Sequence, residues 1–127
     1  MKLLIDSYAW IEYLNATPKG KIARKSIDNE ENELLTLDVC LAEIKFWALQ
    51  QDFDFAKILQ MIKSSSTIME TSSSDWLDAA DVKFEKRKVH RNFGFVDALL
   101  LVYQQKLGAF ILTGDSHFKG NKNIEFL

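Results

Sequence analysis

Short apolar runs alternate with longer segments of helical periodicity along this chain of 127 residues. A continuous apolar run bounded by polar residues is typical of a strand that is buried on both faces of a sheet. Because such runs alternate with helical segments, we expect an α/β fold with helices on both faces of a mostly parallel central sheet, a three-layer α/β/α arrangement. The expected strands are residues 3–5, 34–37, 67–70, 110–112 and 124–126.

The segments between these runs carry apolar residues every three or four positions, which is the period of an amphipathic helix. Asp38 and Asp52 stand where an aspartate side chain commonly caps a helix N-terminus, and Gly108 stands where glycine commonly ends one. Pro18 is expected to end the first helical segment, and Phe84 is expected to point into the core. The expected helices are residues 8–14, 21–31, 38 to about 51, the segment after 52, 75–89 and 95–107.

The composition is that of one globular domain, which we place at residues 1–127. Hydrophobic residues make up 47% of the chain and charged residues 27%, so a sizeable core can form. The net charge of −2 argues against a basic protein that coats nucleic acid non-specifically. The single cysteine allows no internal disulfide, and no apolar stretch is long enough for a signal peptide or a membrane span. We therefore expect a soluble cytoplasmic protein that does not bind a membrane.

Two aspartates follow short apolar runs. Asp6 directly follows residues 3–5, and Asp115 comes three residues after Leu112. Ligands of open parallel sheets bind beyond the carboxyl ends of the strands, so both side chains can lie at the same edge of the predicted sheet. Simpler interpretations stay open, because Asp6 could cap the helix that follows it and Asp115 could be an ordinary turn aspartate.

Two further carboxylates lie inside helical apolar segments. Glu43 has only apolar residues three and four positions away on either side, and Asp97 is the one charged residue between Phe93 and Tyr103. A lone charge on the core side of a helix is costly, which favours carboxylates that are held inward to bind a positive ligand. The alternatives are a Glu43 that reaches water from the edge of the apolar stripe and an Asp97 that interacts with the helix N-terminus.

Four carboxylates that met in one place would repel each other unless a cation neutralised them. The set comprises oxygen donors only, without a cysteine pair or paired histidines, so Mg²⁺ or Mn²⁺ is expected rather than Zn²⁺. Such ions activate water and stabilise the charge that develops on a phosphodiester. The residues therefore predict metal-dependent phosphate chemistry at Asp6, Glu43, Asp97 and Asp115.

Around these four carboxylates the chain resembles the PIN-domain nucleases, particularly the small toxins of VapBC-type toxin–antitoxin pairs. The resemblance extends over essentially the whole chain and rests on four short motifs in a fixed order. One departure is Val96, which stands before Asp97 where the family often has a small residue, and which can reshape the substrate groove. The motifs are residues 4–7 with 10–14, 41–44, 96–99 and 112–118.

The resemblance implies a metal-dependent endoribonuclease that hydrolyses RNA phosphodiester bonds and acts as the toxin of a toxin–antitoxin pair. It implies that the four carboxylates are both the catalytic residues and the metal ligands, and that Ser7 and Thr113 supply supporting hydroxyls. The same resemblance implies Mg²⁺ or Mn²⁺ as the cofactor, an RNA substrate, a small antitoxin protein as a partner, and a homodimer.

A basic run over residues 83–91 holds five Lys or Arg and one Glu. Such a run is usually a solvated helix face, but an acidic site that cuts a polyanion needs positive charge nearby, and this run lies close to Asp97. We therefore take three of its side chains as candidate substrate contacts, through phosphates: Lys86, Arg87 and Arg91.

Other reactive side chains and other functions fit the pattern less well. His90 and His117 are expected at the surface, and Cys40 is expected as a buried structural thiol. A phosphatase of the haloacid dehalogenase type needs a second aspartate where Tyr8 stands. A phospho-acceptor receiver domain needs adjacent acidic residues after the first strand, and only Asp6 is there. These two classes and a catalytically silent PIN-like binding module remain the alternatives.

Overall fold

The computed structural model describes residues 1–127 around a five-stranded sheet in which every neighbouring pair of strands is parallel. The strand order is β3-β2-β1-β4-β5, so the chain builds the sheet outward from β1 to one edge and then to the other. The order therefore reverses between β1 and β4, the place where open α/β sheets bind ligands. The strands are β1 Lys2–Ile5, β2 Glu33–Leu37, β3 Thr67–Met69, β4 Phe110–Thr113 and β5 Ile124–Phe126.

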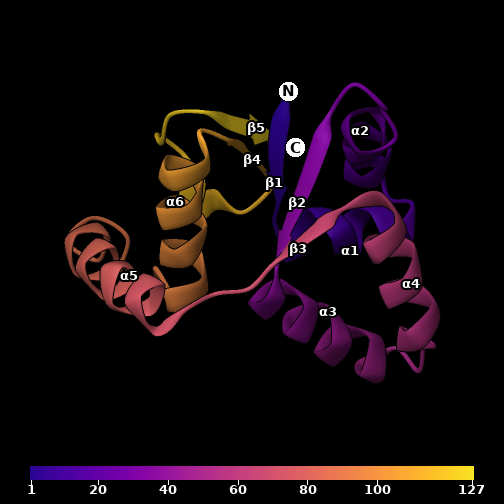
Figure 1. The fold of residues 1–127 in the computed structure, drawn as a ribbon, viewed down its shortest axis with the longest axis horizontal. Coiled ribbons are helices and arrows are strands. Elements are labelled where there is room, and N and C mark those ends of the chain that lie inside the picture. Colours follow the sequence, from indigo (N-terminus) through magenta and orange to yellow (C-terminus); the bar gives the residue numbers. More distant parts are fainter.

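Helices cover both faces of this sheet (Figure 1). α5 and α6 lie on one side, α1, α2 and α4 lie on the other, and α3 extends from the carboxyl end of β2. The predicted three-layer α/β/α class with a parallel sheet is thus confirmed. None of the helices combines the length and the hydrophobicity needed to cross a membrane. The helices are α1 Ser7–Asn15, α2 Pro18–Ile27, α3 Asp38–Gln50, α4 Phe55–Ser65, α5 Ser73–Lys86, α6 Phe95–Leu107 and the short 3₁₀ helix η1 Ser116–Phe118.

The central strand β1 is buried on both faces, as its apolar run predicts. Leu3 and Ile5 face a core formed with α1 to α4, whereas Leu4 between them faces a second core formed with α5 and α6. All three side chains are completely buried. Since successive side chains of a strand point to opposite faces, one short run serves both cores and fixes the register of β1.

Two helix boundaries differ from the sequence-based expectation. α1 ends at Asn15, before Pro18, as expected, but Pro18 itself begins α2, which spans Pro18–Ile27 instead of the expected 21–31. Thr17 Oγ1 caps this helix by accepting a hydrogen bond from the Gly20 N–H at 3.0 Å. Proline suits a first helical turn because the N–H it lacks has no partner there. α4 is capped by Asp54 rather than Asp52, which instead takes a left-handed conformation with φ 58°.

The fifth helix is shorter and less buried than expected. α5 ends at Lys86, three residues before the predicted end, and Phe84 is 69% exposed instead of pointing inward. The buried contacts of α5 come from its other face. There the carboxylate of Asp75 accepts hydrogen bonds from the Tyr103 hydroxyl and the Lys106 ammonium of α6. Those bonds, Lys106 first, hold the pKa of Asp75 well below its usual range.

Gly20 marks the closest approach between α1 and α2. A Cβ at this position would lie 1.9 Å from the backbone oxygen of Glu12, so the two helices could not keep their present spacing. We expect Gly20→Ala to lower the free energy of unfolding by about 1–3 kcal/mol, the usual cost of overpacking. Urea denaturation measures this change. Gly94→Ala is the control, because its Cβ would meet only Asp97 Oδ2 at 3.6 Å; equal losses in both variants would contradict the prediction.

Candidate active site

Asp6 and Thr113 join the ends of the two strands between which the sheet order reverses. Asp6 directly follows β1, and Thr113 is the last residue of β4. The Thr113 hydroxyl donates to Asp6 Oδ2 at 2.7 Å, and it accepts a hydrogen bond from the Asp115 N–H at 3.0 Å. Both side chains are buried. The Thr113 hydroxyl therefore positions both the carboxylate of Asp6 and the backbone of Asp115.

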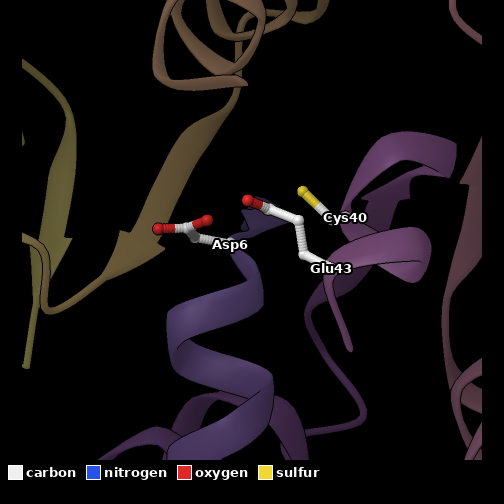
Figure 2. A group of neighbouring side chains, drawn as sticks. All are labelled: Asp6, Cys40 and Glu43. Carbon is white, nitrogen blue, oxygen red and sulfur yellow. The ribbon is translucent and has the colours of Figure 1, made fainter. Parts of the chain in front are cut away.

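Glu43 reaches the same place from α3. Ser7 Oγ donates to Glu43 Oε1 at 2.9 Å and lies 3.4 Å from Asp6 Oδ1, so it bridges the two carboxylates. Figure 2 shows the Glu43 carboxylate extending from α3 toward Asp6, with the sulfur of Cys40 beside it. Glu43 is exposed, so it lies at the edge of the apolar stripe of α3, as one of its two interpretations expects. Its carboxylate nevertheless faces Asp6.

Asp97 lies in the first turn of α6 with its side chain 15% exposed. Its Oδ2 accepts a hydrogen bond from the Gly94 N–H at 2.9 Å and lies 2.9 Å from Nδ1 of His117. The same nitrogen is 3.6 Å from Asp115 Oδ1. The helix-start interpretation of Asp97 is therefore correct, and the same oxygen atom also contacts His117.

The four carboxylates form two adjacent groups at the carboxyl end of the sheet, which we call the acidic rim. Ligand atoms of Asp6, Glu43 and Cys40 lie within 4.8 Å of one another, as do those of Asp97, Asp115 and His117. Thr113 connects the groups through its bonds to both sides. None of the cavities in the molecule is lined by these four carboxylates.

Burial and mutual repulsion shift the acidity of this rim. Burial, followed by the charges of the other three carboxylates, raises the pKa of Asp6 to about 7, although the hydrogen bond from Thr113 opposes the shift. Burial and the charges of Asp97 and Asp115 also raise the pKa of Glu43. The pKa of the Cys40 thiol is raised mainly by burial, and the expected buried cysteine is confirmed. The four carboxylates thus repel one another, and no Lys or Arg side chain beside them offsets their negative charge.

These donors suit a hard divalent cation. Four carboxylates supply oxygen atoms, the hydroxyls of Ser7 and Thr113 orient two of them, and His117 adds one nitrogen at the edge. A bound cation would remove the repulsion that raises the Asp6 and Glu43 pKa values. Cys40 is the only soft donor, and its burial and protonation make it unsuited to an exposed site.

His117 was expected at the surface, and this expectation is wrong. Its side chain is 29% exposed, its ring lies 6.1 Å from that of buried Phe93, and its Nδ1 contacts Asp97. The contact joins η1 to α6 across 20 positions in the sequence, so no local pattern reveals it. The only indication in the sequence was that His117 follows Asp115 by two residues, which places it near the acidic rim.

Two of the three candidate phosphate contacts are already engaged within the protein. Lys86 Nζ donates to Asn121 Oδ1 at 2.7 Å, and Arg87 Nε donates to the backbone oxygen of Phe93 at 2.9 Å. Arg91 is exposed and has no such partner. Arg87 therefore supports the segment that leads into Asp97, and Arg91 is the most available cation of the three.

Sequence and structure comparisons agree on the kind of fold. A family model described as the PIN domain matches residues 3–123. No curated protein matches this chain.

Several solved structures share the whole fold at low sequence identity. VapC20 of Mycobacterium tuberculosis, described as a sarcin–ricin loop cleaving toxin, has a TM-score of 0.77 at 15% identity, with 97% of both chains covered. A toxin–antitoxin complex from Klebsiella pneumoniae has a TM-score of 0.75 at 15% identity, covering 96% of this chain and 94% of its own. VapBC2 of Rickettsia felis, bound to a DNA fragment from its promoter, has a TM-score of 0.74 at 16% identity, covering 100% and 99%.

The raised pKa of Asp6 predicts a pH dependence of stability in the metal-free protein. The folded state holds the Asp6 proton up to about pH 7, whereas an ordinary aspartate loses it near 3.8. The free energy of unfolding of the parent should therefore fall, relative to Asp6→Asn, as the pH rises through this window, by up to about 1.4 kcal/mol per pH unit. Urea denaturation across the window measures the difference.

Asp81→Asn, which alters an exposed aspartate of α5, is the control and should parallel the parent. A constant difference between the parent and Asp6→Asn at every pH would show that the Asp6 pKa is not raised.

Proposed function

Because this chain belongs to the PIN domain family, we propose that it is a metal-dependent endoribonuclease that hydrolyses RNA phosphodiester bonds. The observation that carries the proposal is the pair of hydroxyl bridges at the rim. Ser7 and Thr113 hold the carboxylates of Asp6, after β1, and Glu43, on α3, beside the loop that carries Asp115. Burial, together with repulsion from the neighbouring carboxylates, raises the pKa of Asp6 there. A fold that only bound RNA would gain nothing from this costly arrangement. The proposed catalytic residues are Asp6, Glu43, Asp97 and Asp115.

The same four carboxylates are the proposed ligands for Mg²⁺ or Mn²⁺. When bound, such an ion lowers the pKa of a water molecule and offsets the negative charge that develops on the phosphodiester. The chain's own contribution is orientation. Thr113 fixes Asp6, Ser7 fixes Glu43, and the Gly94 N–H and His117 fix Asp97. Because these bonds exist in the folded chain, little reorganisation is needed during the reaction.

We further propose that this nuclease is the toxin of a toxin–antitoxin pair in the cytoplasm. The support is the likeness over nearly the full length to structures described as toxin–antitoxin and VapBC complexes. A groove of about 520 Å³ between α3 and α4 could receive a helix of an antitoxin, because apolar side chains (Leu41, Ala42, Phe55, Leu59 and Ile68) form half of its lining and charged or polar ones the other half. Exposed Phe46 and Leu49 on α3 support the proposed homodimer, which size-exclusion chromatography with light scattering tests.

RNA cleavage should require a divalent metal and Asp97. We expect cleavage of a labelled RNA in Mg²⁺ or Mn²⁺, loss of cleavage in chelator, and at least a hundredfold slower cleavage by Asp97→Asn. Asparagine retains an oxygen that can accept the Gly94 N–H, so the variant should keep its helix and its thermal stability. Asp81→Asn is the charge-matched control. Full activity in chelator, or an active Asp97→Asn protein, would contradict the proposed mechanism.

Arg91 and Arg87 should behave differently in RNA binding and stability. Arg91→Ala should weaken RNA binding, lower the salt dependence by a slope of about 0.7, and leave stability unchanged, because its exposed side chain has no partner. Arg87→Ala should cost about 1 kcal/mol of stability, because it removes the hydrogen bond to Phe93. Fluorescence anisotropy over a salt titration and urea denaturation separate the two. Parent-like RNA binding by Arg91→Ala would remove Arg91 from the substrate path.

A further inference from the structure

Tyr8 places an aromatic ring at the edge of the acidic rim. It directly follows Ser7 in the first turn of α1, and its half-buried ring packs against Gly114. A Cβ on Gly114 would lie 2.4 Å from Tyr8 Cε1, so only glycine permits this contact. Gly114 connects Thr113 to Asp115. The ring therefore touches the loop between two residues of the site.

Lys19 brings a positive charge to this ring from the first turn of α2. Its Nζ donates to the Tyr8 hydroxyl at 3.0 Å and lies 5.4 Å from the ring centroid. Lys19 is exposed, and no carboxylate lies within ion-pair distance of it. Because its hydrogen-bond partner is a neutral phenol, and Glu12 acts on it only from beyond ion-pair distance, the charge of Lys19 is not neutralised by an ion pair.

The same two helices hold a second pair of a tyrosine and a cation, Tyr13 and Arg24, in which the positive charge is neutralised. Arg24 of α2 lies 4.6 Å from the ring centroid of Tyr13 of α1. Both groups there are bound to Asp28: Arg24 pairs with it at 3.6 Å, and the Tyr13 hydroxyl donates to it at 2.8 Å. The charge of Arg24 is thus neutralised within the protein, whereas the charge of Lys19 is not.

The Lys19 and Tyr8 pair also lies on the opposite side of the sheet from the basic run. α1 and α2 cover one face, and α5, which carries Lys86, covers the other (Figure 1). Positive side chains therefore lie over both faces of the sheet.

We propose that Lys19 and Tyr8 form a nucleotide-binding subsite for single-stranded RNA next to the acidic rim. Lys19 exchanges its hydrogen bond to the phenol for a charge-assisted one to a phosphate oxygen, and the ring that it uncovers stacks on a base. Cations along the backbone and aromatic rings under the bases are the usual means of holding single strands. The inference rests on the proposed nuclease function, since it names a further part of the same substrate site.

The first test compares two charge-matched variants of α2, Lys19→Ala and Arg24→Ala. Each removes one positive charge that lies over a tyrosine of α1. Binding of a labelled single-stranded RNA is measured by fluorescence anisotropy in Mg²⁺, on an Asp97→Asn background that keeps the RNA intact. Lys19→Ala should weaken binding about threefold to tenfold and lower the salt-dependence slope by about 0.7, whereas Arg24→Ala should bind like its parent.

The second test concerns stacking by Tyr8. Tyr8→Leu should weaken RNA binding by roughly fivefold to a hundredfold, whereas Tyr8→Phe, which keeps the ring, should stay close to its parent. Inorganic polyphosphate, which has charge but no bases, should bind both variants equally. Circular dichroism of each variant verifies the fold, and Tyr8→Phe keeps the test decisive if Tyr8→Leu does not fold, because lost RNA binding by a folded Tyr8→Phe would overturn the stacking role.

The outcomes separate this subsite from the proposed function. Unchanged RNA binding by Lys19→Ala, or equal losses in Lys19→Ala and Arg24→Ala, overturns the subsite while metal-dependent cleavage by the unmodified protein still supports the nuclease. If the unmodified protein neither binds nor cleaves RNA, both proposals are overturned. A face that contacts only a protein partner would appear as unchanged RNA affinity in every one of these variants.

Discussion

The burial of a carboxylate next to other carboxylates, at the end of a strand that is covered on both faces, is the constraint around which this molecule is organised. β1 is buried on both faces and ends at Ile5, so the side chain of Asp6, which directly follows the strand, is buried as well. The hydroxyl groups of Ser7 and Thr113 donate hydrogen bonds to the carboxylate oxygens of Asp6, but they do not neutralise its charge. What remains is a local electrostatic cost that the two cores must outweigh, and a position at which a cation is favoured.

The parts of the fold that depend on local sequence were predictable. Short, largely apolar runs located all five strands. In β1 and β4 the run is continuous, because these inner strands lie between the two cores. Asp97 was found for the same physical reason, since a charge within an apolar segment needs an explanation. The exact helix ends were harder to predict. Thr17 and Asp54 cap α2 and α4 through their side chains, and other residues close by in the sequence, such as Asp52, could cap a helix equally well.

Contacts between distant residues were not predictable from the sequence. The bond between His117 and Asp97 joins two elements, and the bond from Arg87 to Phe93 turns an apparently solvated cation into a support for the site. Phe84 was misplaced because periodicity shows that a helix has an apolar stripe but not which side meets the core. The catalytic and metal-binding roles of the four carboxylates stay predictions. The fold brings these side chains together, but their positions alone do not identify a bound ion or a reaction.

The bond between Thr113 and Asp6 spans 107 positions of the chain, and this has a consequence for biosynthesis. A ribosome releases the N-terminal half first, so Asp6 and Glu43 emerge long before β4 can insert beside β1. Until that insertion, Asp6 lacks its hydroxyl partner, and neither Asp97 nor Asp115 can be in place. Until β4 has emerged and inserted, a nascent chain on the ribosome therefore carries only half of its acidic rim.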